Sequence, residues 1–142
     1  MSVNLIAKSS TTISAPASRV WEALTKPEMI KQYFFGTQAI SDWKVGSPLQ
    51  FRGVWEGKEY TDKGIIVKSE PNKLFQYTYL SSFSGLADLP ENYANISYEL
   101  DEDSGQTTLT VKQENIENEE VREHSEKNWA FVLKNLKEFL EK

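Results

Sequence analysis

The sequence predicts an α+β fold in which a curved antiparallel sheet of about six to seven strands wraps around a long C-terminal helix. Three patterns indicate this fold. Two short helical segments follow the first strand, alternating apolar residues then run through the middle of the chain, and residues 118–141 have the spacing of one amphipathic helix. Strands in series favour antiparallel pairing, and helices segregated from the strands are typical of this class.

The N-terminal part of the chain predicts one strand and two short helices. The strand is expected over residues 3–13. Pro16 and Pro27 mark the starts of the helices, because proline is tolerated at the first helical position, where an N–H would have no partner. Gly36 marks the end of the second helix. Apolar residues at helical spacing give the helices their buried faces: Val20, Trp21, Leu24, Met29, Ile30, Tyr33 and Phe34.

The middle of the chain predicts strands separated by turns. Phe75, Tyr77 and Tyr79 alternate with polar residues, which is the period of a half-buried strand. Turns are expected at residues 55–59, 70–73 and 101–106, which are polar and rich in turn-forming residues. The other expected strand segments lie near residues 49–55, 64–67, 96–100 and 109–113.

The expected last helix has charges that suit its dipole. Asn118 is a favourable N-cap, because its side-chain oxygen can accept a hydrogen bond from an N–H of the first turn. Acidic residues follow it and lysines lie near the C-terminal end, an arrangement that the helix dipole favours. One stripe is expected to face the sheet: Val121, Ser125, Trp129, Val132, Leu133, Leu136 and Leu140.

We expect a cavity between sheet and helix, because a straight helix rarely fills the concave side of a twisted sheet. Tyr77, Tyr79 and Tyr98 would give it polar anchors, and an apolar cavity with a few polar groups is typical of a small-molecule site. Alternatively, their hydroxyls pair with the backbone or reach solvent, and the rings fill the core. The expected lining residues are Phe51, Trp55, Phe75, Tyr77, Tyr79, Ile96, Tyr98, Leu109, Val111, Gln113, Trp129 and Leu133.

The composition excludes several kinds of site. The 142 residues include no cysteine and one histidine, which excludes disulfides, thiolate metal sites and histidine clusters, so we expect no metal and no cofactor. The net charge of −5 arises from residues 99–126, with 10 acidic and 2 basic side chains, and argues against nucleic-acid partners. Without a signal peptide or a run of ~20 apolar residues, we expect one cytoplasmic domain over residues 1–142 with no membrane span.

Few residues suggest catalysis. His124 is either a general base at the cavity mouth or, as we favour, a solvated surface histidine. Glu56 and Glu59 flank the tip of a hairpin and are expected to be exposed, while Arg52 has the opposite parity to Phe51 and should face solvent. The acidic run at residues 101–103 is too short for a calcium loop and indicates a hydrophilic hairpin.

Two features bear on accessibility and assembly. Residues 81–92 form a long connection that is either a mobile lid over the cavity or a loop pinned to the body by its apolar residues, which include Phe83 and Leu86. Phe131 lies nearly opposite the buried stripe, as either a homodimer contact or an ordinary exposed aromatic residue. Both a monomer and a homodimer are therefore compatible with the sequence.

A set of short motifs spread over nearly the whole chain resembles one known family. They are Ala15-Pro16-Ala17, residues 20–28, 33–36 and 41–48, Phe51, Gly53, Gly64, Pro71, Leu74, Tyr77, residues 89–93 and 97–100, Trp129, Leu133, Leu136 and Lys137. These motifs resemble the activator of ninety-kilodalton heat-shock protein ATPase family, within the START-like (SRPBCC) superfamily. The resemblance implies the helix-grip fold, also described as Bet v-like, which agrees with the layout derived above.

The resemblance implies less about function, since proteins of one fold perform many functions. START-like relatives bind lipids, sterols, hormones or polyketides, and a few catalyse cyclisation or hydrolysis. The family's eukaryotic co-chaperones carry a separate N-terminal domain that this chain is not expected to contain. We therefore expect binding of a small apolar or amphipathic ligand without covalent chemistry. A chaperone-binding module and a cyclase- or hydrolase-like enzyme are the alternatives.

Overall fold

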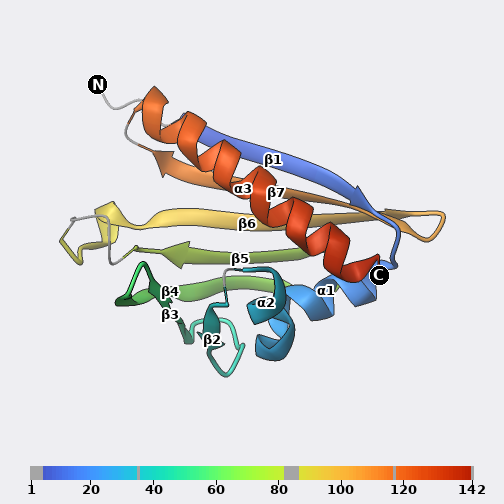
Figure 1. Ribbon diagram of the computed structural model, residues 1–142, viewed down its shortest axis with the longest axis horizontal. Helices are drawn as coiled ribbons and strands as arrows, with labels where there is room; N and C mark the ends of the chain where they lie inside the picture. The colour runs from blue at the N-terminus through green and yellow to red at the C-terminus, as the bar shows by residue number, and fades with distance from the viewer. Residues whose placement is uncertain (1–4, 35, 82–86, 117, 142) are drawn as a thin grey trace.

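The computed structural model describes residues 5–34, 36–81, 87–116 and 118–141, except for the side chain of Trp55. Figure 1 shows the arrangement of the elements. In chain order they are β1 (Leu5–Ile13), α1 (Ala17–Thr25), α2 (Pro27–Tyr33), β2 (Gln38–Ile40), β3 (Pro48–Trp55), β4 (Lys58–Glu70), β5 (Leu74–Tyr79), the 3-10 helix η1 (Pro90–Asn92), β6 (Ala94–Asp103), β7 (Gln106–Ile116) and α3 (Glu119–Leu140).

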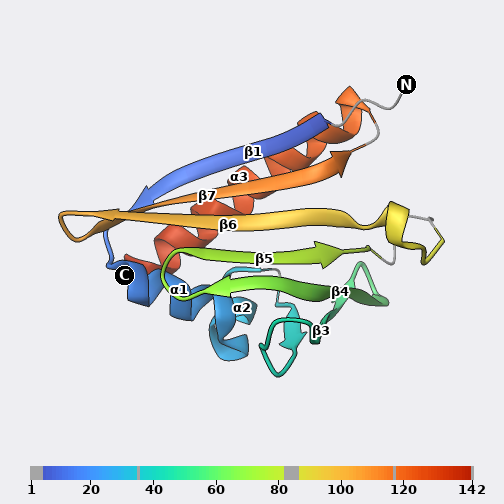
Figure 2. The same cartoon turned by 180° about the vertical axis from the view of Figure 1, so that it is seen from behind.

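The strands form one antiparallel sheet of seven strands in the order β1-β7-β6-β5-β4-β3-β2. Helix α3 lies diagonally across one face, from edge strand β1 toward α1 (Figure 1), and the view from behind places the strands in front of α3 (Figure 2). This architecture confirms the predicted α+β helix-grip fold. Strand β2 is an addition to the strands expected from the sequence.

Alternating burial explains why the middle of the chain forms strands. In β6, Ile96, Tyr98 and Leu100 are buried on the concave face while their neighbours are partly exposed. The β3–β4 and β6–β7 hairpins close through two-residue turns with positive φ at both positions, Glu56-Gly57 and Ser104-Gly105. This turn geometry matches the right-handed twist of the strands that it joins.

Gly64 is required where β4 and β5 come closest. A Cβ atom built there would lie 1.6 Å from the carbonyl oxygen of Thr78, so no other residue fits without moving a strand. The Thr78 hydroxyl accepts a hydrogen bond from the N–H of Ile65 at 2.9 Å, which satisfies a donor beside this close approach. The β4–β5 register also shifts between Ile66 and Lys68, and such irregularities bend a strand.

Helix α3 begins as predicted, because the Asn118 side chain accepts a hydrogen bond from the N–H of Val121 at 2.9 Å. Its buried residues are Trp129, Val132, Leu133 and Leu136. The predicted stripe is therefore too long at its N-terminal end, where Val121 is 38% exposed. Only the second half of α3 packs its apolar face fully into the core.

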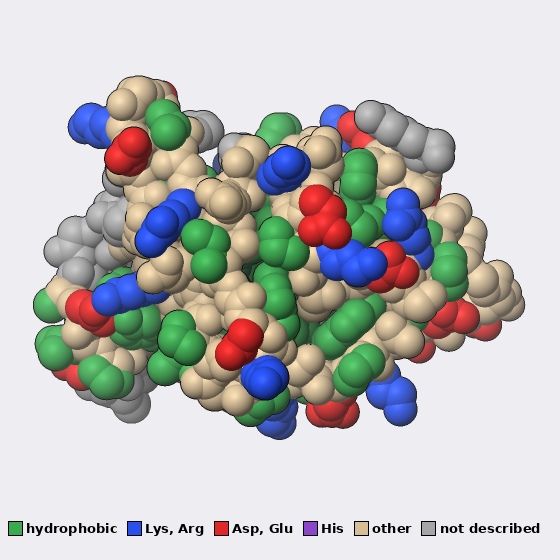
Figure 3. Space-filling model, turned by 90° about the horizontal axis from the view of Figure 1, so that it is seen from below, with side chains coloured by type: hydrophobic (Ala, Val, Ile, Leu, Met, Phe, Trp, Pro, Cys, Tyr) green, Lys and Arg blue, Asp and Glu red, His purple; other side chains and the backbone are tan. Residues whose placement is uncertain are grey.

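The surface carries scattered hydrophobic side chains. Val45 and Val54 are each 60% exposed, and Phe131 is 52% exposed, as predicted for a residue opposite the buried stripe. On the face seen in Figure 3, hydrophobic side chains lie between charged groups of both signs. None of the described helices is long and apolar enough to cross a membrane.

Replacing Trp129 by alanine should lower the free energy of unfolding by about 3–5 kcal/mol, because the ring is buried between α3 and the sheet. Chemical denaturation monitored by far-ultraviolet circular dichroism would measure the loss. Phe131→Ala is the matched control on the same helix, with an expected loss below about 1 kcal/mol. Equal losses for the two variants would show that α3 faces the sheet differently.

Candidate functional site

The space between α3 and the sheet is filled at one end and hollow at the other. At the end near α1, Phe75, Tyr98 and Leu133 are buried, and the gap that Phe75 and Tyr98 border holds about 10 Å³. At the other end, beneath the first half of α3, a cavity of about 370 Å³ remains. A cavity of this size falls within the usual range of small-molecule sites.

The cavity is lined by residues from the sheet, from α3 and from the segment after α2. The sheet supplies five strands and Ser81, which follows β5. The lining residues are Phe34, Thr37, Phe51, Tyr60, Asp62, Tyr77, Tyr79, Ser81, Ile96, Gln113, His124, Ser125, Asn128 and Trp129. Six aromatic residues and Ile96 make most of the wall surface apolar, and the other seven of these lining residues are polar.

An aromatic partition separates the packed end from the cavity. The Tyr77 and Tyr98 hydroxyls share a hydrogen bond of 2.9 Å. The Tyr98 ring meets the Trp129 ring edge-on, with centroids 6.0 Å apart. The Trp129 indole N–H donates to Oε1 of Gln113 at 2.9 Å. Tyr77, Gln113 and Trp129 therefore line the cavity with polar atoms that already have partners within the protein.

Further polar groups gather at the β4 and β5 side of the cavity. The Tyr79 hydroxyl donates to Oδ2 of Asp62 at 2.5 Å, and Asp62 is only 5% exposed. The Tyr60 and Thr37 hydroxyls share a hydrogen bond of 2.6 Å. Tyr60 lies opposite Gly53 in the β3–β4 register, and a Cβ atom at Gly53 would lie 2.5 Å from the Tyr60 hydroxyl. The missing side chain of Gly53 thus gives the Tyr60 ring its position.

The Tyr77, Tyr79 and Tyr98 hydroxyls stay protonated at neutral pH. Burial raises the pKa of Tyr77, Tyr79 and Tyr98 above the ordinary value of 10.0. The nearby Asp62 carboxylate raises the pKa of Tyr79 further, because a second negative charge beside it is unfavourable. These groups therefore act as neutral hydrogen-bonding groups.

Six of the twelve residues expected from the sequence line the cavity, and five of the others are buried outside it. Phe51, Tyr77, Tyr79, Ile96, Gln113 and Trp129 line it. The side chain of Trp55 lies outside the described part of the structure. The remaining five are buried but belong to the packed end or to the partition, because the second half of α3 presses against that part of the sheet: Phe75, Tyr98, Leu109, Val111 and Leu133.

Sequence reasoning missed several lining residues. Tyr60 and Asp62 share the parity of Ile66, which is buried on β4, so a longer strand assignment would have placed them on the concave face. Thr37 and Ser81 lie outside helices and strands and carry no periodic signal. His124 is exposed, as we favoured from the sequence, and it also lines the cavity on α3.

The other candidate groups lie apart from the cavity. Arg52, Glu56 and Glu59 are exposed, as predicted. Glu102 of the acidic run accepts a hydrogen bond from the N–H of Ala17 at 2.5 Å and so caps the start of α1. Within the described ranges, no three histidine, aspartate or glutamate side chains come together in a way that could hold a metal ion.

The proposed lid falls largely outside the described residues, because residues 82–86, with Phe83 and Leu86, are not described. The part that follows is attached to the sheet. Asp88 forms an ion pair with Lys63 of β4 and accepts a hydrogen bond from the Tyr93 hydroxyl at 2.5 Å.

Comparison with protein families assigns the chain. The family model described as "Activator of Hsp90 ATPase homolog 1-like protein" matches residues 14–141. The chain belongs to this family. This agrees with the resemblance carried by the sequence motifs. Comparison with curated proteins found no match.

Solved structures of similar proteins support the fold. The solution structure of ChR145 from Cytophaga hutchinsonii is 44% identical, with a TM-score of 0.86 over 99% of this chain and 97% of that chain. The Aha1 dimer from Colwellia psychrerythraea is 22% identical, with a TM-score of 0.76 over 96% of each chain. Ara h 8.0201 is 12% identical, with a TM-score of 0.76 over 97% of this chain and 98% of that chain, and shares the fold.

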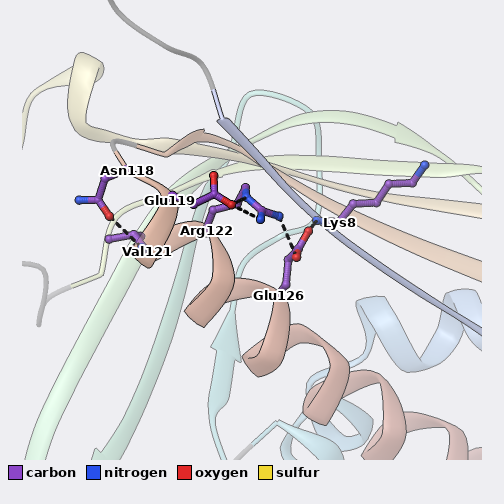
Figure 4. Close-up of polar contacts among 6 residues, drawn as sticks. All are labelled: Lys8, Asn118, Glu119, Val121, Arg122 and Glu126. Carbon is purple, nitrogen blue, oxygen red and sulfur yellow. Dashed lines mark hydrogen bonds and ion pairs between the residues drawn. The ribbon is translucent and has the colours of Figure 1, made fainter.

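In this member of the family, polar contacts of Glu126 hold the first half of α3, which covers the cavity (Figure 4). Oε2 of Glu126 accepts a hydrogen bond from the backbone N–H of Lys8 on β1 at 3.1 Å. Oε1 of Glu126 lies 2.9 Å from the Arg122 guanidinium, which also pairs with Glu119. Because β1 is an edge strand, Glu126 both occupies a free strand donor and attaches the first half of α3 to the sheet edge.

We expect stability to fall as pH rises above about 10. The pKa of Tyr33, Tyr77 and Tyr98 is raised in the folded chain above 10.0. Above that pH the unfolded tyrosines lose protons while the folded ones do not, so the unfolded state is favoured. Urea unfolding between about pH 8 and about pH 11 would measure the loss. A double variant, Tyr77→Phe with Tyr98→Phe, should lose less stability than the parent over this range, and an identical slope in the two proteins would contradict the assignment.

Replacing Glu126 by alanine should loosen the first half of α3. The loss of its hydrogen bond to β1 should lower the free energy of unfolding by about 1 kcal/mol, a value that allows for partial exposure. Amide hydrogen exchange at Lys8 should become faster. Glu123→Ala removes an exposed acid from the same helix and should leave that exchange rate unchanged. Unaltered protection of Lys8 in Glu126→Ala would show that Glu126 does not hold the helix.

Proposed function

We propose that this protein binds a small, largely apolar ligand in the cavity beneath the first half of α3, without covalent chemistry. The observation that carries this proposal is the cavity of about 370 Å³, whose wall surface is mainly apolar and comes from six aromatic residues and Ile96, with polar side chains between them. A cavity of this make-up favours a ligand that replaces water against apolar walls and makes a small number of hydrogen bonds.

The cavity walls are organised before any ligand arrives. The hydrogen bonds from Tyr77 to Tyr98 and from Trp129 to Gln113 hold these side chains in place. Phe34 and Phe51 stack with centroids 6.1 Å apart and add a rigid aromatic wall. Binding to such walls requires little ordering of side chains, which favours affinity.

Binding is a better account of the cavity than proton-transfer catalysis. A general acid or base works best when its pKa lies near the working pH. The raised pKa values of Tyr77 and Tyr79 move these hydroxyls away from that range. His124 is exposed at the α3 wall, so a solvated position competes with any role in the cavity.

A second candidate function is that of a chaperone partner, which is supported by the family's description as activators of an Hsp90 ATPase. Stimulation of the ATPase of Hsp90 from the same organism would test it. A rate increase that saturates at micromolar concentrations would support this role, and an unchanged rate together with no binding would exclude it.

Filling the cavity should abolish binding. Ser125 lines the cavity on α3, so the ring of Ser125→Phe would occupy its space. We expect the neutral apolar fluorophore N-phenyl-1-naphthylamine to bind the parent saturably and Ser125→Phe at least about tenfold more weakly. Lys127→Phe adds the same ring at an exposed position of α3 and should bind like the parent. Absence of saturable binding to the parent, or equal affinity in Ser125→Phe, would overturn the proposed function.

A further inference from the structure

The side chain of Gln113 presents a hydrogen-bond donor to the cavity. Its Oε1 atom accepts a hydrogen bond from the Trp129 indole N–H at 2.9 Å, and within the part of the chain that the structure describes its Nε2 atom has no partner. We propose that the ligand carries a neutral carbonyl oxygen, which accepts a hydrogen bond from Nε2 of Gln113, and an apolar body, which lies against the aromatic walls. This inference rests on the proposed function and specifies the chemical class of its ligand.

The orientation of the Gln113 amide is fixed by Trp129. An indole N–H can only donate, so the carbonyl end of the amide must face it and the NH₂ end is left for another partner. The opposite orientation would set two donors against each other. The Trp129 ring is itself 6% exposed and meets Tyr98 edge-on. The donor is therefore in place before any ligand binds, which favours affinity.

The surroundings of Gln113 leave the cavity as the open space beside its amide. On the concave face of β7 it lies opposite Ile96 of β6 and Ala7 of β1, which are 1% and 0% exposed. Among the described residues, no buried side-chain nitrogen or oxygen lacks a hydrogen-bond partner. Because Nε2 of Gln113 has none, it borders open space, and Gln113 lines the cavity. A ligand that covers this donor must supply an acceptor, since a buried donor without one is unfavourable.

Helix α3 adds two polar side chains near this donor. Ser125 lies one helical turn before Trp129 on the same face, and Ser125 and Asn128 both line the cavity. Neither side chain forms a hydrogen bond with a described residue. Both can donate, and a carbonyl oxygen has two lone pairs, so a second hydrogen bond to the same oxygen can come from α3.

The lining favours a neutral acceptor over a charged one. Among the described lining residues there is no lysine or arginine, and His124 is exposed. A carboxylate that entered the cavity would lose hydration without gaining a buried countercharge, which is costly. A neutral carbonyl loses less hydration and still accepts from Gln113.

The walls beside Gln113 suit an apolar body. Ile96, its neighbour in the sheet, gives an aliphatic surface next to the amide. Phe34 stacks on Phe51 and meets Trp129 edge-on, with centroids 6.2 Å apart. These walls and one amide donor match a molecule with an aromatic or aliphatic body that carries a ketone, ester or amide carbonyl.

Three ligands that share a naphthalene ring provide the test. They are 2-acetonaphthone, which has a neutral carbonyl, 2-isopropenylnaphthalene, in which a CH₂ group replaces that oxygen, and 2-naphthoate. Each displaces N-phenyl-1-naphthylamine from the full chain at one neutral pH, which gives its affinity. The hydrocarbon is the most apolar of the three, so burial alone predicts that it binds most tightly. A hydrogen bond from Gln113 predicts instead that the ketone binds at least about threefold more tightly than either of the others.

The outcomes separate this inference from the proposed function. Displacement by the hydrocarbon or the carboxylate with an affinity equal to or higher than that of the ketone would overturn the inference and leave the proposed function intact. Displacement by none of the three would overturn both.

The variant Gln113→Met tests whether this amide is the source of the preference. Methionine keeps the length of the side chain and removes the donor, so the hydrocarbon should then bind at least as tightly as the ketone. Gln106→Met makes the same change at an exposed position of β7 and should keep the parent's ranking. Near-ultraviolet circular dichroism verifies folding. An unchanged ketone preference in folded Gln113→Met would overturn the assignment. Should this variant not fold, Gln113→Glu, which keeps an oxygen for Trp129 and replaces the NH₂ donor by an oxygen, decides in the same way.

Discussion

The structure depends on the way in which one straight helix meets a twisted sheet. Helix α3 has 22 residues, and only its second half buries its apolar face. Its first half is attached to the edge of the sheet, where Glu126 accepts a hydrogen bond from the backbone of β1. The helix therefore crosses the sheet diagonally, as Figure 1 shows, and covers the part of the concave face near α1 more closely than the opposite part. The cavity is the geometric result of this diagonal.

The aromatic partition divides the space between α3 and the sheet into a packed region and a cavity. Tyr98 belongs to the packed end, Tyr77 and Trp129 border the cavity, and all three are joined by a hydrogen bond or an edge-on ring contact. Their polar atoms find partners within the partition, so their burial does not require a ligand. The packed end therefore supplies apolar burial to the fold, while rings and polar groups at the other end line the cavity.

The fold was largely predictable from the sequence because it follows from periodicity. The alternation around Tyr77, the cap at Asn118 and the proline at the start of α2 are local signals, and the structure contains each expected element. The family resemblance additionally predicted how these elements are arranged, as a curved sheet around the last helix. Strand β2 was missed because three residues are too few to show an alternation.

The candidate site was only partly predictable, for a reason of geometry. Parity along a strand tells which side chains face the helix, but it does not tell where along the strand the helix makes contact. Phe75 and Tyr77 have the same parity, yet only Tyr77 borders the cavity. Thr37 and Ser81 reach the cavity from segments without regular structure, and their positions follow from tertiary packing.

Asp62 shows where the pattern of the sheet and the residue type differ. Alternation on β4 places Asp62 on the concave face, where it is 5% exposed, although a buried carboxylate is unfavourable unless it has polar partners. The Tyr79 hydroxyl is one such partner, because it donates a hydrogen bond to Oδ2 of Asp62. The packed end of the space between α3 and the sheet therefore contains apolar packing, while polar groups at the cavity end pair with one another.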